Sequence, residues 1–181
     1  MSPDTGTDGR PRRVVLYGNP VLRRKSALVR NIDDDVRRFL ADLKTTMQIR
    51  DGLGLAANQV AVPLMAFAID PRGADVDASP YCVLNPSLEA TEGTVEREEG
   101  CLSFPGLYEV LKRPEKVVVS GIDEQGRPVR IEATGTLARA FSHEIDHLNG
   151  ILFIDHISDT RRKLLAGPLR ELEQQEAAAC G

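Results

Sequence analysis

Residues 137–150, with the sequence LARAFSHEIDHLNG, constrain the fold of this chain more than any other stretch. They contain His143, Glu144 and His147 in an H-E-x-x-H pattern. On a helix, side chains four residues apart lie on the same face one turn apart, so the two imidazoles can bind one metal ion. Glu144 is then placed to take a proton from a water molecule on that ion. The pattern therefore predicts a helix that carries a metal site.

The other face of the same helix is apolar. It carries Leu137, Phe141, Ile145 and Leu148. At helical periodicity both histidines project away from this stripe, so one side is predicted to pack on a core while the other faces a polar pocket. Glu144 lies between the two faces, where partial burial raises the pKa of a carboxyl and suits it to acid–base catalysis. Gly150 is suited to end the helix.

Catalytic zinc-like sites hold three protein ligands and leave a position for water, so the helix needs a third ligand from elsewhere. Cys101, in the sequence EGCLS, is the better candidate because Gly100 permits close backbone approach. His156 is a weaker one, since it lies nine residues beyond His147. The alternative for Cys101 is a buried, inert thiol. A thiolate with two imidazoles would accept Fe²⁺, Zn²⁺, Ni²⁺ or Co²⁺.

A third motif, GLGLAANQ, spans residues 52–59. Its glycines and alanines leave little side chain, so another backbone or a substrate can approach closely. Gln59 ends the motif with an amide that could donate to a developing oxyanion. The simpler alternative is a flexible loop between a helix and a strand, with a surface glutamine. A phosphate-binding P-loop is excluded because no Gly-Lys-Ser/Thr follows.

Length and composition predict one soluble domain. The 181 residues are 41% hydrophobic and 28% charged, with a net charge of −4 that gives no reason to expect nucleic-acid binding. No apolar run approaches the ~18 residues of a membrane span, and the N-terminus lacks a signal-peptide core. The three cysteines indicate no disulfide framework, so we expect a reducing cytoplasm. No role is assigned to Cys82 or Cys180.

The remaining elements indicate an α+β fold. We expect short, mostly antiparallel sheets packed around the metal-binding helix, with an N-terminal amphipathic helix and a C-terminal helix. The N-terminal helix should begin at Asn31 or Asp33 and end near residues 51–52. Strands are predicted at residues 64–69, 81–84 and 88–97, and a hairpin at 116–122 and 129–133.

The domain organisation follows from composition. Residues 1–13 are predicted to be a disordered tail, and residues 14–181 a single catalytic domain. Its C-terminal helical tail should start from about residue 158, at Ser158 or Asp159. Gly167 and Pro168 should break or kink that helix.

Taken together, GLGLAANQ, EGCLS and HEIDHLNG resemble the motifs of bacterial-type peptide deformylases, over roughly residues 14 to 165. The resemblance implies hydrolysis of the N-formyl group from the formyl-methionine of new proteins, releasing formate. The implied metal is typically Fe²⁺, with Zn²⁺, Ni²⁺ or Co²⁺ as alternatives. Its implied ligands are Cys101, His143 and His147.

The resemblance also implies roles for other residues. Glu144 would be the general base and acid, and the Gln59 side chain with the Leu102 backbone N–H would form the oxyanion hole. The substrate would pair as an added strand with the backbones of three residues. Arg139 departs from the family, because its position is often apolar and lines the methionine pocket; its aliphatic stem could serve there. The three backbone positions are Leu53, Gly54 and Gly100.

Four further points concern this chain in particular. Ser142 precedes the first histidine, where many relatives have glutamine. Family members can dock on the ribosome through a basic C-terminal helix, whereas Arg170, Glu171, Glu173 and Glu176 leave this tail acidic, which speaks against docking there. Glu99 is expected to support the metal ligands, and Asp146 to pair with Arg113, the alternative for Asp146 being a solvated acid.

Two other classes of protein compete with this interpretation. A zincin-like endopeptidase would need a third ligand downstream of the helix and a long cleft. A non-catalytic protein with a structural metal would need four protein ligands. Because three convincing ligands and a retained glutamate are present, an open catalytic site is favoured.

Overall fold

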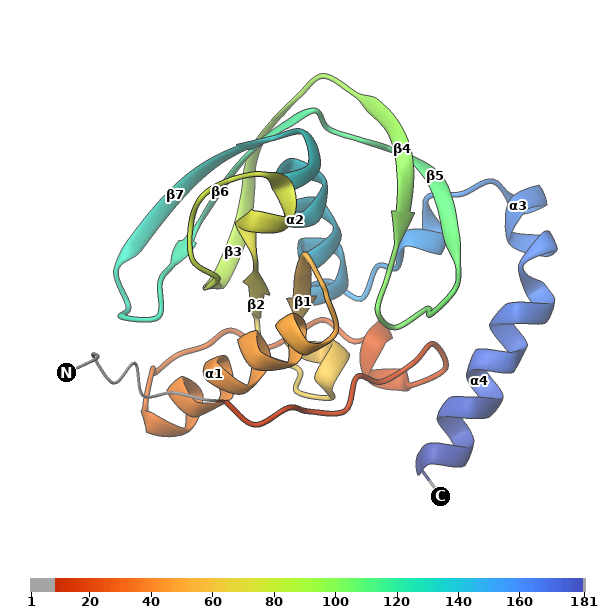
Figure 1. The fold of residues 1–181 in the computed structure, drawn as a ribbon, viewed down its shortest axis with the longest axis horizontal. Helices are drawn as coiled ribbons and strands as arrows, with labels where there is room; N and C mark the ends of the chain where they lie inside the picture. The colour runs from red at the N-terminus through yellow and green to blue at the C-terminus, as the bar shows by residue number, and fades with distance from the viewer. Residues whose placement is uncertain (1–8, 181) are drawn as a thin grey trace.

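The computed structural model describes residues 9–180 and has the predicted α+β fold (Figure 1). A five-stranded sheet has the order β1-β2-β3-β6-β7, and β4 and β5 form a separate pair. All neighbouring strands are antiparallel. The strands are β1 (Gly54–Ala56), β2 (Ala66–Ile69), β3 (Tyr81–Glu92), β4 (Val95–Gly100), β5 (Tyr108–Arg113), β6 (Lys116–Ile122) and β7 (Pro128–Thr134).

Helix α2 (Gly135–Leu148) is the predicted HEIDH helix and lies at the centre of the fold (Figure 1). Its predicted apolar stripe is buried against one face of the large sheet, where the Phe141 and Phe67 rings meet edge to face with centroids 5.5 Å apart. Gly150 follows the helix with φ +76°, the left-handed conformation that favours glycine at a helix end. One face of α2 is thus fixed in the core while its histidines point elsewhere.

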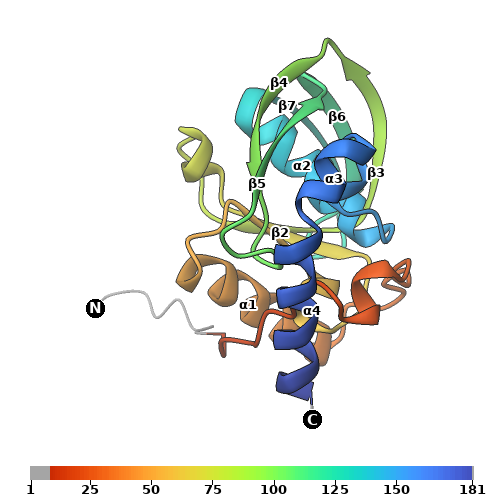
Figure 2. The ribbon, with the colours of Figure 1, turned by 90° about the vertical axis from the view of Figure 1, so that its right-hand side faces the viewer.

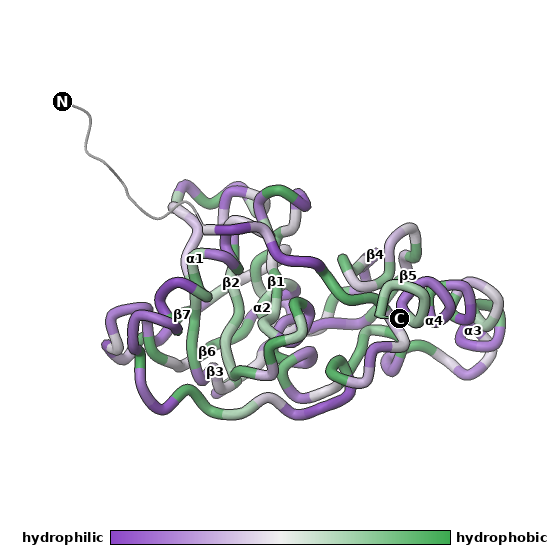
Figure 3. The backbone as a smooth tube through the Cα atoms, turned by 90° about the horizontal axis from the view of Figure 1, so that it is seen from below, coloured by the Kyte–Doolittle hydropathy of each residue, from purple (hydrophilic) through white to green (hydrophobic). Residues whose placement is uncertain are grey.

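Helix α1 (Asp34–Ile49) covers the opposite face of the sheet. Asp33 caps it, because its Oδ1 accepts a hydrogen bond from the Val36 N–H at 2.9 Å. Alternate residues of β2 face the two cores: Phe67 packs under α2, and Ala66 under α1. The view from below shows hydrophobic residues gathered along β1 and β2 (Figure 3).

The predicted strands at 81–84 and 88–97 are divided differently in the structure. β3 runs without interruption through residues 85–87, and β4 begins only at Val95. Asn85 has φ +49°, and its side chain bonds both the N–H and the carbonyl of Val29, while the pairing with β6 shifts register beside it. A bulge therefore joins two segments that the sequence pattern separates.

The C-terminal segment folds as α3 (Asp159–Leu164), capped by Ser158, and α4 (Ala166–Cys180). The helix is interrupted at Leu165, two residues before the predicted position at Gly167, and Pro168 lies in the first turn of α4, where proline is tolerated. α4 runs along one side of the molecule, which it contacts through Leu169, Leu172 and Glu176 (Figure 2). Within residues 9–180, no helix has the length and apolarity needed to cross a membrane.

The expected N-terminal tail falls partly outside the described residues, which begin at Gly9. The Arg10 N–H donates to Asp42 Oδ1 at 2.7 Å, and the Arg12 N–H donates to Thr46 Oγ1 at 2.9 Å. Both acceptors belong to α1, so this part of the expected tail is attached to the domain.

Candidate metal and catalytic site

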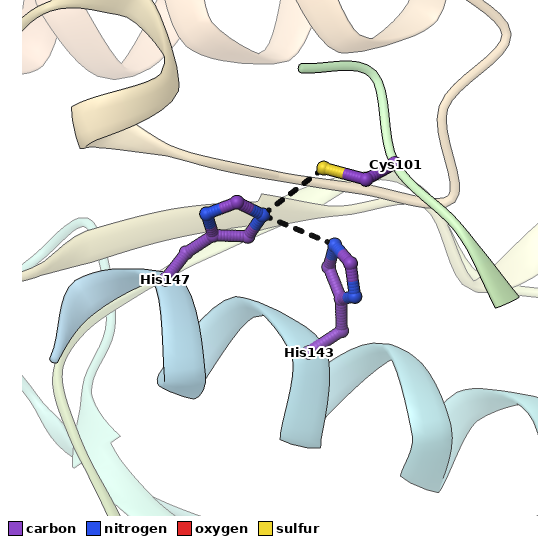
Figure 4. Close-up of side chains that lie close together, drawn as sticks. All are labelled: Cys101, His143 and His147. Carbon is purple, nitrogen blue, oxygen red and sulfur yellow. Dashed lines mark hydrogen bonds between the residues drawn. The ribbon is translucent and has the colours of Figure 1, made fainter. Parts of the chain in front are cut away.

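The structure brings the three predicted metal ligands together (Figure 4). His147 Nε2 lies 3.1 Å from Cys101 Sγ and 3.1 Å from His143 Nε2. The three atoms lie within 4.8 Å of one another. The imidazoles rise from consecutive turns of α2, and the thiol reaches them from the segment after β4 (Figure 4). The four-residue spacing of His143 and His147 is enough to predict that they lie together. The tertiary fold is needed to bring the Cys101 sulfur beside them.

The chemistry of this group fits a divalent transition metal. Two ring nitrogens and a sulfur converge on one point, and a cation shared by all three satisfies lone pairs that a single proton cannot. One soft thiolate and two imidazoles suit Fe²⁺, Zn²⁺, Ni²⁺ or Co²⁺. His156 lies outside the group and instead contacts Asp146 Oδ2 at 2.7 Å. The third candidate ligand thus precedes the helix in sequence, contrary to the zincin-like alternative.

Glu144 is buried beside the ligands, with 3% of its surface exposed. Its Oε2 has no hydrogen-bond partner among the described residues, and burial raises the pKa of the carboxyl to about 7. Gly54 on β1 makes room for it, because a Cβ at that position would lie 2.5 Å from Glu144 Oε1. The site therefore contains a carboxyl that can hold or release a proton near neutral pH.

Glu99 on β4, on the other side of His143, has several donors. Its Oε1 contacts His143 Nδ1 at 2.6 Å and accepts from Arg113 Nη2 at 2.7 Å. Its Oε2 accepts from Arg113 Nε and from Arg139 Nη1, each at 3.0 Å. Burial alone would raise the pKa of Glu99, but the bonds to His143 and Arg113 hold it well below its usual range. The expected support of a ligand by Glu99 is thus present as a direct contact to His143.

The predicted pairing of Asp146 with Arg113 is also present. Arg113 Nη1 donates to Asp146 Oδ2 at 2.6 Å, and His156 contacts the same oxygen. Arg113 therefore bridges Glu99 and Asp146, a connection that the sequence did not indicate. Burial raises the pKa of Asp146, but the bonds to His156 and Arg113 outweigh burial and lower it.

Gln59 is fully buried in the short 3₁₀ helix Ala57–Val60, so the alternative of a surface glutamine is wrong. Its Nε2 lies 3.4 Å from Cys101 Sγ and 3.2 Å from Ser103 Oγ. Its Oε1 accepts from the Ala56 N–H at 2.9 Å, which orients the amide with its NH₂ group toward the sulfur. Leu102 follows Cys101 directly, so its backbone lies beside the same ligand.

A cleft of about 610 Å³ leads to these groups. Its lining includes the four residues expected to contact substrate, namely Leu53, Gly54, Gly100 and Arg139. Tyr108 and Thr136 also line the cleft and were not predicted, since neither stands in a recognisable motif. Two buried neighbours were missed as well: Asn58, which donates to the His147 carbonyl, and Ser103. Both stand inside the motifs GLGLAANQ and EGCLS, which is the signal that could have found them.

Two histidines of an HEIDH helix and a cysteine from another segment form a candidate metal site, beside a buried glutamate that lines a cleft. This arrangement is typical of metal-dependent hydrolases. Comparison with known proteins narrows this class. The profile of the polypeptide deformylase family matches residues 11–163. The chain therefore belongs to the peptide deformylase family, whose members are metal-dependent hydrolases of N-formyl peptides.

Individual peptide deformylases are similar to this chain over most of its length. The peptide deformylase of Thermodesulfovibrio yellowstonii is 43% identical over 148 residues, covering 82% of this chain and 90% of that protein. The peptide deformylase structure from Legionella pneumophila superposes with a TM-score of 0.84 at 35% identity, covering 92% of this chain and 98% of that one. The structure from Thermus thermophilus gives a TM-score of 0.84 at 38% identity, covering 91% of this chain and 98% of that one.

Proposed function

We propose that this protein removes the formyl group from the N-terminal formyl-methionine of newly synthesised proteins and releases formate, acting in the cytoplasm. The observation that carries the proposal is the convergence of Cys101, His143 and His147 beside Glu144, whose Oε2 has no partner among the described residues. We further propose Fe²⁺ as the native metal, with Zn²⁺, Ni²⁺ and Co²⁺ as competent substitutes. When bound, such a cation supplies Lewis acidity that activates water near neutral pH and polarises a carbonyl.

Glu144 serves as the proton carrier. Its carboxylate takes a proton from the attacking water, and the carboxylic acid then gives that proton to the amine as the formyl C–N bond breaks. A pKa of about 7 suits both directions of transfer near neutral pH. The products are formate and a peptide with a free methionine amine.

Gln59 and Leu102 form the oxyanion hole in this proposal. The Gln59 amide is held by Ala56 and Ser103, so its NH₂ group is aimed before a substrate arrives. The Leu102 backbone N–H supplies the second donor. Losing one such donor costs about 10²–10³ in rate in comparable sites.

The substrate backbone binds as an added strand. β1 is an edge strand of the large sheet, and β4 is one of only two strands in its own sheet, so among the described strands each has an edge to offer. Leu53 and Gly54 contribute the first edge and Gly100 the second. The methionine side chain lies against the stem of Arg139 and Ala140, which line the same cleft.

The proposed partner is a nascent formyl-methionyl peptide. We do not extend the proposal to ribosome docking through α4, since this helix carries Glu171, Glu173 and Glu176 against a single Arg170.

The test is formate release from N-formyl-Met-Ala-Ser by protein purified without oxygen. We expect turnover that a chelator abolishes and that added Fe²⁺ or Ni²⁺ restores. Acetyl-Met-Ala-Ser, which differs by one methyl group on the acyl carbon, is the matched substrate control, and its cleavage is followed by release of the free methionine amine. A metal-loaded protein that releases no formate would contradict the proposal.

A further inference from the structure

Arg139 lies on α2 one turn before the metal ligand His143, and both side chains end on the same carboxylate. Arg139 Nη1 donates to Glu99 Oε2 at 3.0 Å, while His143 Nδ1 contacts Glu99 Oε1 at 2.6 Å. Only 8% of the surface of Arg139 is exposed. Each carboxylate oxygen of Glu99 is therefore tied to a different residue of the same helix face.

Arg139 contributes to the charge balance of this buried group, which His143 and His156 also contact. Glu99 and Asp146 contribute two negative charges, while Arg113 contributes one positive charge and contacts both carboxylates. Arg139 supplies the second positive charge. An uncompensated charge in such surroundings is strongly destabilising, so removing the Arg139 guanidinium should disturb the position of Glu99.

Arg139 also forms part of the cleft wall. Its guanidinium bonds Glu99 and lies 3.5 Å from the carbonyls of Val95 and Leu111. This anchoring leaves the aliphatic stem as the surface available to a bound side chain. One residue thus contacts both the substrate cleft and the carboxylate that holds a metal ligand.

We propose that Arg139 is a positioning residue that fixes Glu99, and through it the orientation of His143, while its stem shapes the substrate pocket. The second half of this inference rests on the proposed function; the first half concerns metal binding alone. Two separable effects follow. Loss of the guanidinium weakens metal retention through Glu99, and loss of the stem raises KM for the formyl peptide.

The experiment is a double-mutant cycle on metal affinity. Arg139→Met keeps an unbranched stem but removes the guanidinium, and it is placed in wild-type and Glu99→Gln backgrounds. Co²⁺ affinity is measured by chelator competition, with the Co²⁺–thiolate absorption as a second readout. We expect Arg139→Met to weaken Co²⁺ binding by about 10–100-fold in the wild-type background, as losses of outer-shell partners do. In the Glu99→Gln background the same change should have an effect of about twofold or less.

Two control variants accompany this measurement of Co²⁺ affinity. Arg130→Met removes an exposed arginine from the surface pairs with Glu89 and Glu132, and should leave Co²⁺ affinity unchanged. Arg139→Lys retains a positive charge and a donor, so it should restore much of the affinity lost in Arg139→Met. Should Arg139→Met fail to fold, the same cycle is run with Arg139→Gln, which also removes the positive charge.

An equal loss of affinity in both backgrounds, or no loss in either, would overturn the positioning role. These outcomes are independent of turnover. If the metal-loaded wild-type protein releases no formate, the proposed function fails while the cycle on Co²⁺ affinity still decides the role of Arg139.

Discussion

Two buried carboxylates flank His143, and they differ in the number of side chains that donate hydrogen bonds to them. Glu99 and Glu144 expose 6% and 3% of their surface, so both have lost nearly all contact with water. Glu99 contacts two guanidinium groups and an imidazole, whereas Glu144 Oε2 has no partner among the described residues. The pKa of Glu99 is accordingly lowered, and that of Glu144 is raised to about 7. Burial raises the pKa of both carboxyls, and only Glu99 has enough donors to outweigh it.

The elements that face each carboxylate explain this difference. Glu99 stands on β4, and the neighbouring strand β5 ends in Arg113, which reaches back to it. Glu144 stands on α2 and faces Gly54 of β1, a residue without a side chain. Glu99 is held as an anion behind the candidate ligand His143, and Glu144 can exchange a proton at the cleft.

The largest expected effect comes from Glu144, whose Oε2 has no hydrogen-bond partner among the described residues. Glu144→Gln keeps the shape of the side chain but cannot carry a proton, so formate release should fall by about 10²–10⁴-fold. Metal content should stay the same, because Glu144 is not among the three proposed ligands. Glu96→Gln, an exposed change on β4, is the matched control. Activity of Glu144→Gln within tenfold of wild type would mean that the proton carrier is another group.

A smaller effect is expected from filling the space beside Glu144. Gly54→Ala would place a methyl group 2.5 Å from Glu144 Oε1, so the carboxylate must move. A displacement of about 1 Å can cost on the order of 10²-fold in rate, and we expect a loss of that order in kcat with little change in stability. Gly167→Ala is the control, since a Cβ there meets nothing within 4 Å. Full activity in Gly54→Ala would show that the close contact has no catalytic importance.

The smallest expected effect concerns Glu176 on α4, a third buried carboxylate that lies far from the candidate metal ligands in sequence. Burial would raise its pKa, but bonds from Asn19, the Leu16 N–H and Arg13 lower it to about 2. Since the pKa is lower in the folded state, this stabilisation is complete above about pH 4.5 and is lost as pH falls towards 2. We expect Glu176→Gln to reduce unfolding free energy at pH 7 by about 1–3 kcal/mol with catalysis retained.

The check is chemical denaturation of wild type and Glu176→Gln at several pH values. The difference between the two proteins should shrink as pH falls from 4.5 towards 2. Glu171→Gln, on an exposed position of the same helix, should match wild type throughout. A constant difference at all pH values would mean that Glu176 is not held as an anion by its donors.

The sequence predicted the elements whose signals are local. The apolar stripes of α1 and α2, the Asp33 cap and the β6–β7 hairpin follow from periodicity and turn residues, and the structure confirms them. The metal-ligand group was predicted because the histidine spacing is itself a helical repeat and Cys101 stands in a compact motif. These features need little information from distant parts of the chain.

The unpredicted parts depend on contacts between distant residues. β5 buries Glu109, Leu111 and Arg113 and exposes Tyr108 and Val110, so its alternation does not match the hydrophobic pattern of an ordinary strand. Its buried charges are satisfied by Arg161 and Glu99, from α3 and β4. β1 has three residues, too few for any periodicity. The bond from Arg139 to Glu99 spans 40 residues and turns an expected pocket residue into part of a charge network.

The most direct test of the account is X-ray absorption at the metal edge of the Fe²⁺- or Ni²⁺-loaded protein. We predict one sulfur and two imidazole nitrogens per metal, from Cys101, His143 and His147. Cys101→Ser should remove the sulfur signal and leave the nitrogen signal. A stoichiometrically bound metal without a sulfur ligand in the wild-type protein would contradict the proposed site.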